Sequence, residues 1–313
     1  MKQFFIKTLF FILPFIVVAF IVEYKLRKIP NSYNYKKECL KNKSNTLVTV
    51  VSGASTALYG INPSCFTQPT FNLANASQSL YFDKELLLQQ LDKLPKLKNV
   101  IIPIAYQSLY YKMNDSREKV RVYAYNIFWN IKDQNFKPFD ISNYSFIALL
   151  TPQSVFKIAK KGFKKIDEDG INLINDMGFT AMDSTQQNLR INDSMGRERY
   201  LSHVDLMKES NVKNNIEILQ ELLTALHKKN INIYFVSTPL YKTYTKYLDN
   251  KTVAKNDSII NVLCKQFSCT YSNFSLDSRF FKEDFYDNDH LNKYGATKFS
   301  LILDSVIEHK NCK

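Results

Sequence analysis

Apolar residues along the chain fall into short runs of the kind that form buried strands. They cover residues 46–51, 71–73, 99–105, 231–236 and 269–271. The first run, TLVTVV, is rich in β-branched residues and stops at Ser52-Gly53, which is typical of a strand inside a parallel sheet. Between the runs, apolar residues recur at helical spacing over residues 83–94, 214–229, 256–267 and 294–307. This alternation predicts an α/β fold whose parallel sheet is covered on both faces.

The alternation stops between residues 110 and 212, where tyrosine, phenylalanine and asparagine replace clear strands. We interpret this interval as a helical insertion or lid within a single catalytic-size domain over residues 46–313. Residues 29–45, IPNSYNYKKECLKNKSN, are polar, basic and weakly periodic, so we expect them to form a linker.

The first residues have the pattern of a transmembrane helix. Residues 8–22 carry no charge, and a helix of about twenty residues spans about 30 Å, the thickness of the hydrocarbon layer. Glu23 and Tyr24 follow directly, and no A-x-A cleavage site is present. We therefore expect residues 1–28 to be an uncleaved signal-anchor.

The net charge of +13 is concentrated at this end of the chain. Nine Lys or Arg and two Glu lie in residues 1–45, so the rest of the chain is only mildly basic, which argues against nucleic acid and for a membrane surface or acidic polymer as partner. Basic residues after position 22 outnumber those before it, and by the positive-inside rule alone the large domain would be cytoplasmic.

The five cysteines match no zinc-ligand spacing, and an odd number cannot all pair within the chain. Cys264 and Cys269 are read either as a local disulfide, if the domain lies outside the cytoplasm, or as buried thiols.

One set of residues has the composition of a serine hydrolase site. Ser55 follows Gly53-Ala54 at the end of a strand, where the start of a helix presents its hydroxyl; the same position suits an ordinary helix N-cap. Asp287 lies three residues before His290, a spacing that lets the carboxylate orient the imidazole toward a serine. A metal site is the competing use of an Asp/His cluster, but only one histidine is present locally, so we expect neither a metal nor a cofactor.

Three segments resemble the blocks of SGNH/GDSL hydrolases. They are GAS-TALYGINP (53–63), NLANASQSL (72–80) and DNDHLNKYGA (287–296) before a C-terminal helix. The tethered layout resembles the envelope branch that includes teichoic-acid D-alanylation and alginate O-acetylation proteins. The resemblance implies a flavodoxin-like three-layer SGNH fold, with Ser55 as nucleophile, His290 as general base and Asp287 as the residue that orients it.

The chain departs from that family in two blocks. Ala54 stands where the family's GDS has Asp, and no GxND block supplies the Asn of the oxyanion hole. Substitute donors are the backbone of Ser55 together with Ser77, Gln78 or Gln107. His203, with Arg197, Arg199 and Tyr200, is either part of the substrate site or a solvated polar loop.

These features predict a serine-dependent acyltransferase or esterase, acting on O-acetyl groups of a cell-envelope or extracellular polysaccharide. The resemblance places it as a single-pass protein of the bacterial inner membrane with an extracytoplasmic domain, beside a multispan membrane acyltransferase. One alternative is a non-catalytic polysaccharide-binding or assembly protein on the same fold. Another is a lipid esterase that faces the cytoplasm.

Overall fold

The computed structural model describes residues 1–163, 174–183 and 187–311. The chain divides into two compact units, and each is described by itself. One consists of Met1–Tyr35 with Val120–Ile171, and the other of Lys36–Lys119 with Asn172–Lys313. The second unit contains the sheet and the expected catalytic residues.

The sheet is parallel and has five strands, all of them expected from the sequence. They are β1 (Thr49–Val51), β2 (Thr70–Asn72), β3 (Asn99–Pro103), β4 (Asn232–Ser237) and β5 (Thr270–Asn273), in the order β2-β1-β3-β4-β5. This is the flavodoxin-like order, in which ligands bind outside the carboxyl ends of β1 and β3, where the strand order reverses. The α/β fold class is confirmed.

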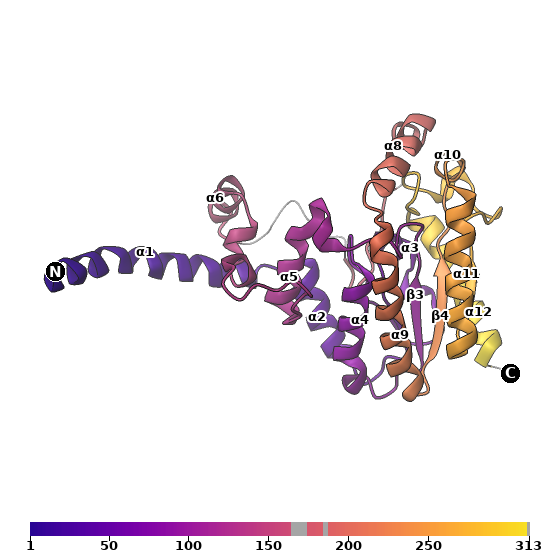
Figure 1. The fold of residues 1–313 in the computed structure, drawn as a ribbon, viewed down its shortest axis with the longest axis horizontal. Helices are drawn as coiled ribbons and strands as arrows, with labels where there is room; N and C mark the ends of the chain where they lie inside the picture. The colour runs from indigo at the N-terminus through magenta and orange to yellow at the C-terminus, as the bar shows by residue number, and fades with distance from the viewer. Residues whose placement is uncertain (164–173, 184–186, 312–313) are drawn as a thin grey trace. The chain divides into compact units, whose positions relative to one another are not determined.

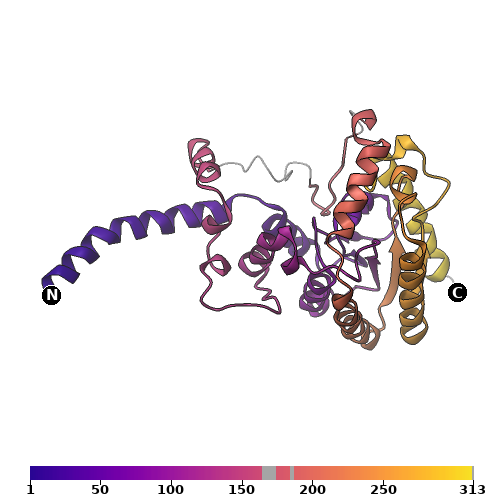
Figure 2. The same cartoon turned by 45° about the horizontal axis from the view of Figure 1, so that its top comes forward.

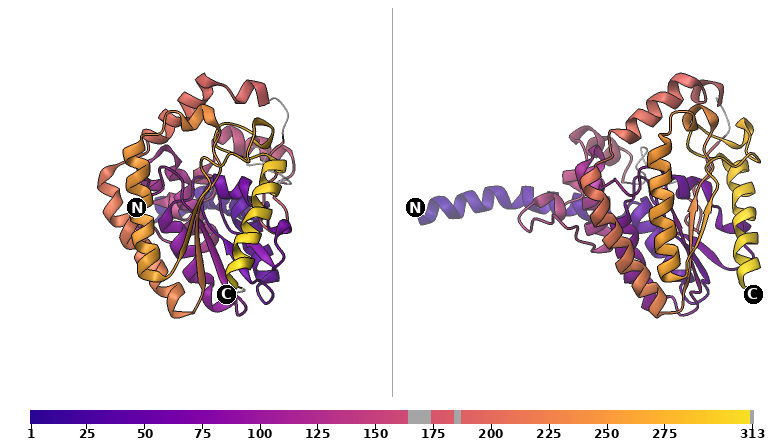
Figure 3. Two further views of the ribbon diagram at one scale, coloured as in Figure 1. Left: turned by 90° about the vertical axis from the view of Figure 1, so that its right-hand side faces the viewer. Right: turned by 45° about the vertical axis from the view of Figure 1, so that its right-hand side comes forward.

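Helices cover both faces of this sheet, which makes three layers (Figure 1 and Figure 3). On one face α4 (Leu80–Gln90) packs against α9 (Val212–Lys228), and α9 packs against α11 (Asn250–Phe267). On the other face α3 (Ser55–Gly60) packs against α12 (Lys293–Asn311). Four of these five helices follow from the periodicity of the sequence, and α3 is the short helix that begins at Ser55.

Both helical layers are held by apolar stripes. Leu219, Leu222 and Leu226 of α9 are fully buried, as is Phe299 of α12. Each such side chain contributes about 1.5–3 kcal/mol by leaving water. The strands between the layers are therefore rigid supports for the loops at their carboxyl ends.

Three further helices lie at the end of the sheet where those loops emerge (Figure 2). They are α7 (Gln187–Arg190), α8 (Asp193–Val204) and α10 (Lys242–Thr245). Helix α8 packs tightly on α10 at Gly196, where an added Cβ would lie 2.2 Å from the carbonyl oxygen of Thr243. The expected insertion over residues 110–212 is thus divided, because α8 belongs to the unit with the sheet and residues 120–171 belong to the other unit.

The first unit is helical. It contains α1 (Lys2–Lys28), α5 (Val120–Trp129) and α6 (Pro152–Lys160). The Glu23 carboxylate near the end of α1 accepts hydrogen bonds from the N–H groups of Phe146 (2.7 Å) and Ile147 (3.0 Å). Within the described residues α1 is one helix that is long and apolar enough to cross a membrane, with a mean hydropathy of 2.7 and no burial of its apolar stretch. A signal sequence has the same properties.

Within residues 29–45, which we expect to form a linker, Ser32–Lys43 form helix α2. From Lys36 onward this helix belongs to the second unit. The Lys36 side chain is 1% exposed, and its ammonium donates to the carbonyl oxygens of Asn72 (3.2 Å) and Ala74. Burial lowers the pKa of Lys36 to about 7. This lysine ties α2 to the end of β2.

Four cysteines lie in the described part of the chain, and the structure has them as thiols rather than disulfides: Cys39, Cys65, Cys264 and Cys269. Cys264 is buried on α11 and Cys269 directly precedes β5. Cys312 lies outside the described residues.

Candidate active site

Ser55 stands at the first position of α3, four residues after the last residue of β1. The intervening turn depends on Gly53, whose φ of +116° is a conformation that side chains with a Cβ rarely adopt. An added Cβ there would also lie 3.1 Å from Pro103. The turn carries Ser55 to the carboxyl end of the sheet and directs its hydroxyl toward the loop before α12.

A buried carboxylate fixes this turn. One oxygen of Asp83, on α4, accepts from the Ser52 hydroxyl (2.5 Å), the Gly53 N–H (2.7 Å) and the Gln78 amide (2.7 Å). Burial raises the pKa of Asp83 to about 6, although these hydrogen bonds act in the opposite direction. Asp83 therefore supplies a carboxylate beside the Gly-Ala-Ser turn, whose own sequence has Ala54 instead of an acid.

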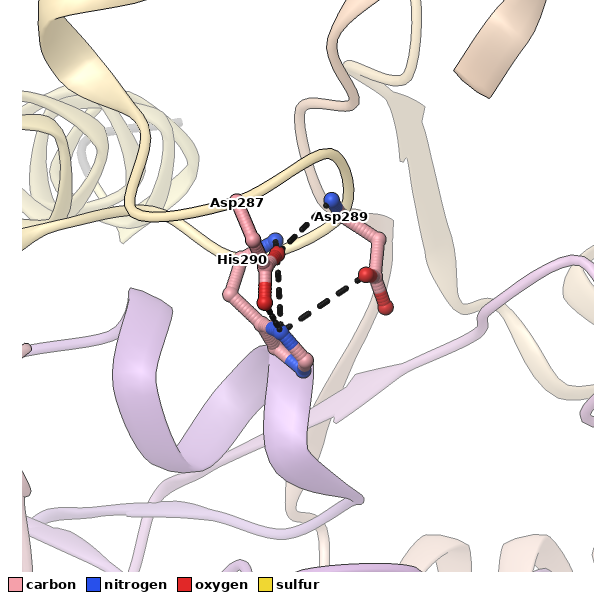
Figure 4. Close-up of side chains that lie close together, drawn as sticks. All are labelled: Asp287, Asp289 and His290. Atoms are coloured by element: carbon pink, nitrogen blue, oxygen red, sulfur yellow. Dashed lines mark hydrogen bonds and ion pairs between the residues drawn. The ribbon is translucent and has the colours of Figure 1, made fainter. Parts of the chain in front are cut away.

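Asp287 and His290 come from a tight loop between Phe285 and Leu291, which form an antiparallel bridge. The Asp287 carboxylate accepts from the backbone N–H groups of Asp289 (3.0 Å) and His290 (2.8 Å), so the loop turns back on itself. That turn brings the Asp287 carboxylate onto the imidazole of His290 (Figure 4). The spacing of three residues is what permits this geometry.

The three expected catalytic side chains meet. His290 Nδ1 lies 2.9 Å from Asp287 Oδ2, and His290 Nε2 lies 2.9 Å from Ser55 Oγ. A carboxylate can only accept, so Nδ1 carries the proton and donates it, and Nε2 is left to accept from the serine hydroxyl. Nucleophile, base and orienting carboxylate thus form one continuous chain of hydrogen bonds. That they catalyse a reaction stays a prediction.

A second carboxylate lies behind the imidazole. Asp289 is 2% exposed, and one of its oxygens lies 3.6 Å from His290 Nδ1. Arg199 of α8 donates to both oxygens, at 2.8 and 2.9 Å. Burial alone would raise the pKa of Asp289, but its electrostatic interactions with His290 and Arg199 outweigh burial and hold that pKa well below its usual range. Asp289 is therefore an anion inside the protein.

His203 lies at the oxygen of the Asp289 carboxylate opposite the one nearest His290, and is the next member of this group of side chains. Its Nε2 lies 3.7 Å from Asp289 Oδ2, and its Nδ1 is 2.6 Å from the Tyr244 hydroxyl. Burial lowers the pKa of His203 to about 4, so the ring is neutral near pH 7. The side chain is 6% exposed and belongs to helix α8, which corrects the reading of this segment as a solvated polar loop.

The charges around His290 alter its basicity. Burial lowers the pKa of His290, but the negative charges of Asp287 and Asp289 outweigh burial, and the net pKa is raised. Arg199 opposes part of that rise. A raised pKa makes the imidazole a stronger base for the serine proton and stabilises the imidazolium that forms after transfer.

Asp287, Asp289 and His290 also have the composition of a metal site, because their ligand atoms lie within 4.8 Å of one another (Figure 4). In the structure both oxygens of Asp289 bind the Arg199 guanidinium, and Asp287 holds the backbone of its own loop. A cation would have to displace the Arg199 guanidinium from the buried Asp289 carboxylate. The cluster fits a charged hydrogen-bond network better than it fits a metal.

A cavity of about 100 Å³ opens at Ser55. Of the four residues suggested as oxyanion or substrate ligands, Ser77, Gln78, Gln107 and His203 all line it. The Gln78 amide is engaged with Asp83, which leaves Ser77 and Gln107 better placed to meet a ligand. The N–H of Ser55 lies in the first turn of α3, where helical N–H groups have no partner in the preceding turn.

Sequence reasoning missed the roles of Asp83 and Asp289, and placed Arg199 only in a loose cluster. Asp83 had a signal, since it interrupts the apolar face at the start of a helix. Asp289 had none, because an acid in a polar loop looks exposed until its partner ninety residues earlier is known.

Comparison with known proteins gives likeness in structure only. No protein-family model matches the chain, and no curated protein is similar to it in sequence. A GDSL-like lipase from Bacteroides thetaiotaomicron superposes with a TM-score of 0.43 at 10% identity, over 90% of this chain and 100% of its own. A Bacteroides fragilis protein, provisionally described as an acylhydrolase, gives a TM-score of 0.41 at 8% identity, over 88% and 95%. Superpositions at this level assign neither family nor activity, so the functional interpretation rests on the side chains.

Proposed function

We propose that the protein is a serine-dependent acyl hydrolase or acyltransferase of the SGNH type. The observation that carries this is the continuous contact from Asp287 through both nitrogens of His290 to Ser55, with 2.9 Å at each imidazole nitrogen. A helix N-cap alone would account for the position of Ser55, but not for a buried, carboxylate-oriented imidazole on its hydroxyl.

The geometry supports a two-step reaction. Ser55 Oγ attacks the acyl carbonyl as its proton passes to His290 Nε2, and His290 then returns that proton to the leaving alkoxide. The resulting acyl-serine ester is attacked by water or a sugar hydroxyl, whose proton passes to His290 and then to Ser55 Oγ. Asp287 holds the ring in the required tautomer throughout.

The oxyanion of each tetrahedral intermediate needs donors near Ser55. We assign the N–H of Ser55 as the first of them, with Ser77 or Gln107 from the cavity wall as the second. The cavity at Ser55 is small, and its wall has polar and apolar parts of similar extent, which suits a short acyl group on a hydroxyl-rich substrate better than a long alkyl chain.

We therefore infer an O-acetyl group on a cell-envelope polysaccharide as the substrate. Helix α1 would anchor the protein in the bacterial inner membrane with the catalytic unit outside the cytoplasm, where a multispan partner could supply acyl groups. The length and apolar surface of α1 support the anchor. A reporter-fusion test of topology decides the sidedness, and a cytoplasmic catalytic unit would contradict this localisation.

A serine-directed fluorophosphonate tests the proposed chemistry directly. The full chain in detergent should be labelled at Ser55, as mapped by mass spectrometry, and Ser55→Ala should abolish the label. Ser64→Ala, an exposed serine nine residues further on, is the matched control and should label like the wild type. Labelling elsewhere with Ser55 unreactive would favour a non-catalytic, polysaccharide-binding role for the fold.

A further inference from the structure

A second cavity lies beside the one at Ser55. It measures about 50 Å³ and is bounded by the loops after β3, β4 and β5 together with helix α11. Ala105, Gln107 and His203 line both cavities, and Thr56, the neighbour of the nucleophile, lines the second. The two cavities are therefore adjacent, and a ligand in the second lies alongside Ser55.

Asn256 of α11 forms part of the wall of this second cavity. Its side chain is 6% exposed, and its amide nitrogen donates to the carbonyl oxygen of Tyr106 (2.9 Å). That bond fixes the orientation of the amide. Its oxygen, Oδ1, is buried and has no hydrogen-bond partner among the described residues. Such an acceptor costs about 1–3 kcal/mol unless a ligand or water donates to it.

The rest of the wall combines aromatic rings with polar groups. Tyr106, Tyr244 and Tyr271 line the cavity, as do Asp257 and Asn273. Tyr200 lies 6.1 Å from Tyr106 and 6.2 Å from Tyr244, centroid to centroid, so the rings form one cluster. Aromatic faces next to amide and carboxylate oxygens suit the C–H faces and hydroxyls of a sugar.

An alkyl chain would pack on the apolar part of this wall, which includes Ile104, Leu240 and Leu248, but not on its buried acceptor. It would cover Asn256 Oδ1 without donating a hydrogen bond, whereas a hydroxyl would satisfy it. The cavity has room for only a few non-hydrogen atoms, which is the size of a hydroxyl-bearing edge of a sugar rather than a whole ring.

We propose that the second cavity binds the hydroxyl-bearing edge of a sugar, with a sugar hydroxyl donating to Asn256 Oδ1. Under the proposed function, this holds the saccharide beside Ser55, where its acyl group is removed or its hydroxyl receives one. Sugar binding itself requires no chemistry at Ser55. It can therefore succeed or fail independently of fluorophosphonate labelling.

Ligand-observed NMR on the full chain in detergent tests the proposal, with methyl glycosides of glucose, mannose and N-acetylglucosamine as probes. At least one glycoside should receive saturation from the wild-type protein. Asn256→Ala should weaken its affinity by at least about tenfold. Asn261→Ala, on the exposed side of the same helix, is the control and should bind like the wild type.

A second variant separates binding from the structural bond to Tyr106. Asn256→Asp keeps an acceptor oxygen but cannot donate to the Tyr106 carbonyl, so retained glycoside binding in this variant supports the acceptor role. The proposal is overturned if no glycoside binds the wild type, if Asn256→Ala binds as tightly as the wild type, or if pentane, which has no hydrogen-bond donor, occupies the cavity in preference to the sugars.

Discussion

Replacing Arg199 by methionine probes the buried charges behind His290. The guanidinium donates two hydrogen bonds to Asp289, at 2.8 and 2.9 Å, and the carboxylate it pairs with is 2% exposed. Methionine keeps most of the length and apolar volume of the arginine. The substitution therefore removes the charge and leaves an anion inside the protein.

The cost follows from that burial. Removing one partner of a buried ion pair destabilises a protein by about 3–5 kcal/mol. The Arg199 side chain is 34% exposed, so water can reach part of the gap and we expect the lower end, about 3 kcal/mol. For a domain of this size each kcal/mol lowers the Tm by about 2–4 °C, which predicts a loss of about 6–12 °C.

Thermal unfolding of the full chain in detergent, followed by near-UV circular dichroism, measures this loss. Arg197→Met is the matched control, because Arg197 is exposed on the same helix. The double variant Arg199→Met/Asp289→Asn removes the stranded charge and should recover most of the stability. If Arg199→Met melts together with Arg197→Met, Asp289 is not the buried anion described above.

Three further substitutions have outcomes that follow from the site. Asp287→Asn removes the carboxylate that selects the tautomer of His290, so kcat for a p-nitrophenyl ester should fall by about 10³–10⁴, with KM little changed. Asp289→Asn removes a negative charge 3.6 Å from His290 Nδ1, which lowers the pKa of that base and should move the acidic limb of the kcat/KM profile to lower pH. Burial raises the pKa of Asp83 from 3.8 to about 6, so its contribution to stability is full below pH 3.8 and is lost as the pH rises to 6. The free energy of unfolding of the wild type should fall by about 3 kcal/mol across this pH range, and that of Asp83→Asn should not. Denaturant titrations at several pH values measure both.

Each of these has a contrary result. An Asp287→Asn enzyme with wild-type kcat would show that the imidazole needs no orienting carboxylate. An unmoved or alkaline-shifted limb in Asp289→Asn would mean that Arg199, and not Asp289, dominates the field at His290. Parallel stability curves for wild type and Asp83→Asn would indicate that Asp83 titrates alike in the folded and unfolded chain.

Strands β1 to β4 could be predicted from the sequence because their burial is nearly complete. Residues such as Val50, Val100 and Phe235 are covered on both faces of the sheet, so the runs that contain them are apolar without interruption. The helices on either side show apolar residues at helical spacing for the same reason. Local composition is a good guide wherever burial involves apolar side chains alone.

Helix α2 shows where this guide fails. Tyr33 and Leu40 are buried on one face of it, but the position between them on that face is taken by Lys36, whose charge hides the periodicity. The backbone carbonyls that accept hydrogen bonds from its ammonium belong to residues 72 and 74, and no pattern in the sequence of the helix predicts these partners. A buried polar group is compensated by partners far away in the sequence.

Prediction of the candidate catalytic residues from the sequence met the same limit. The pair Asp287 and His290 could be predicted because one loop contains both, and Ser55 because a strand end and a small-residue turn mark it. Asp289 and Arg199 acquire their meaning only from each other. Asp83 on α4 and Asn256 on α11 likewise reach the site only because both helices pack on the assembled sheet.

His290 follows Ser55 by 235 positions in the sequence, and this separation has a consequence for the order of synthesis. The proposed nucleophile leaves the ribosome before its proposed base, the carboxylate that orients the base and the helix that supports their loop. A growing or truncated chain that lacks residues 285–311 therefore holds a serine with no partner to accept its proton. Under the proposed function such a chain is inert toward esters until α12 docks, and its reactivity reports that docking.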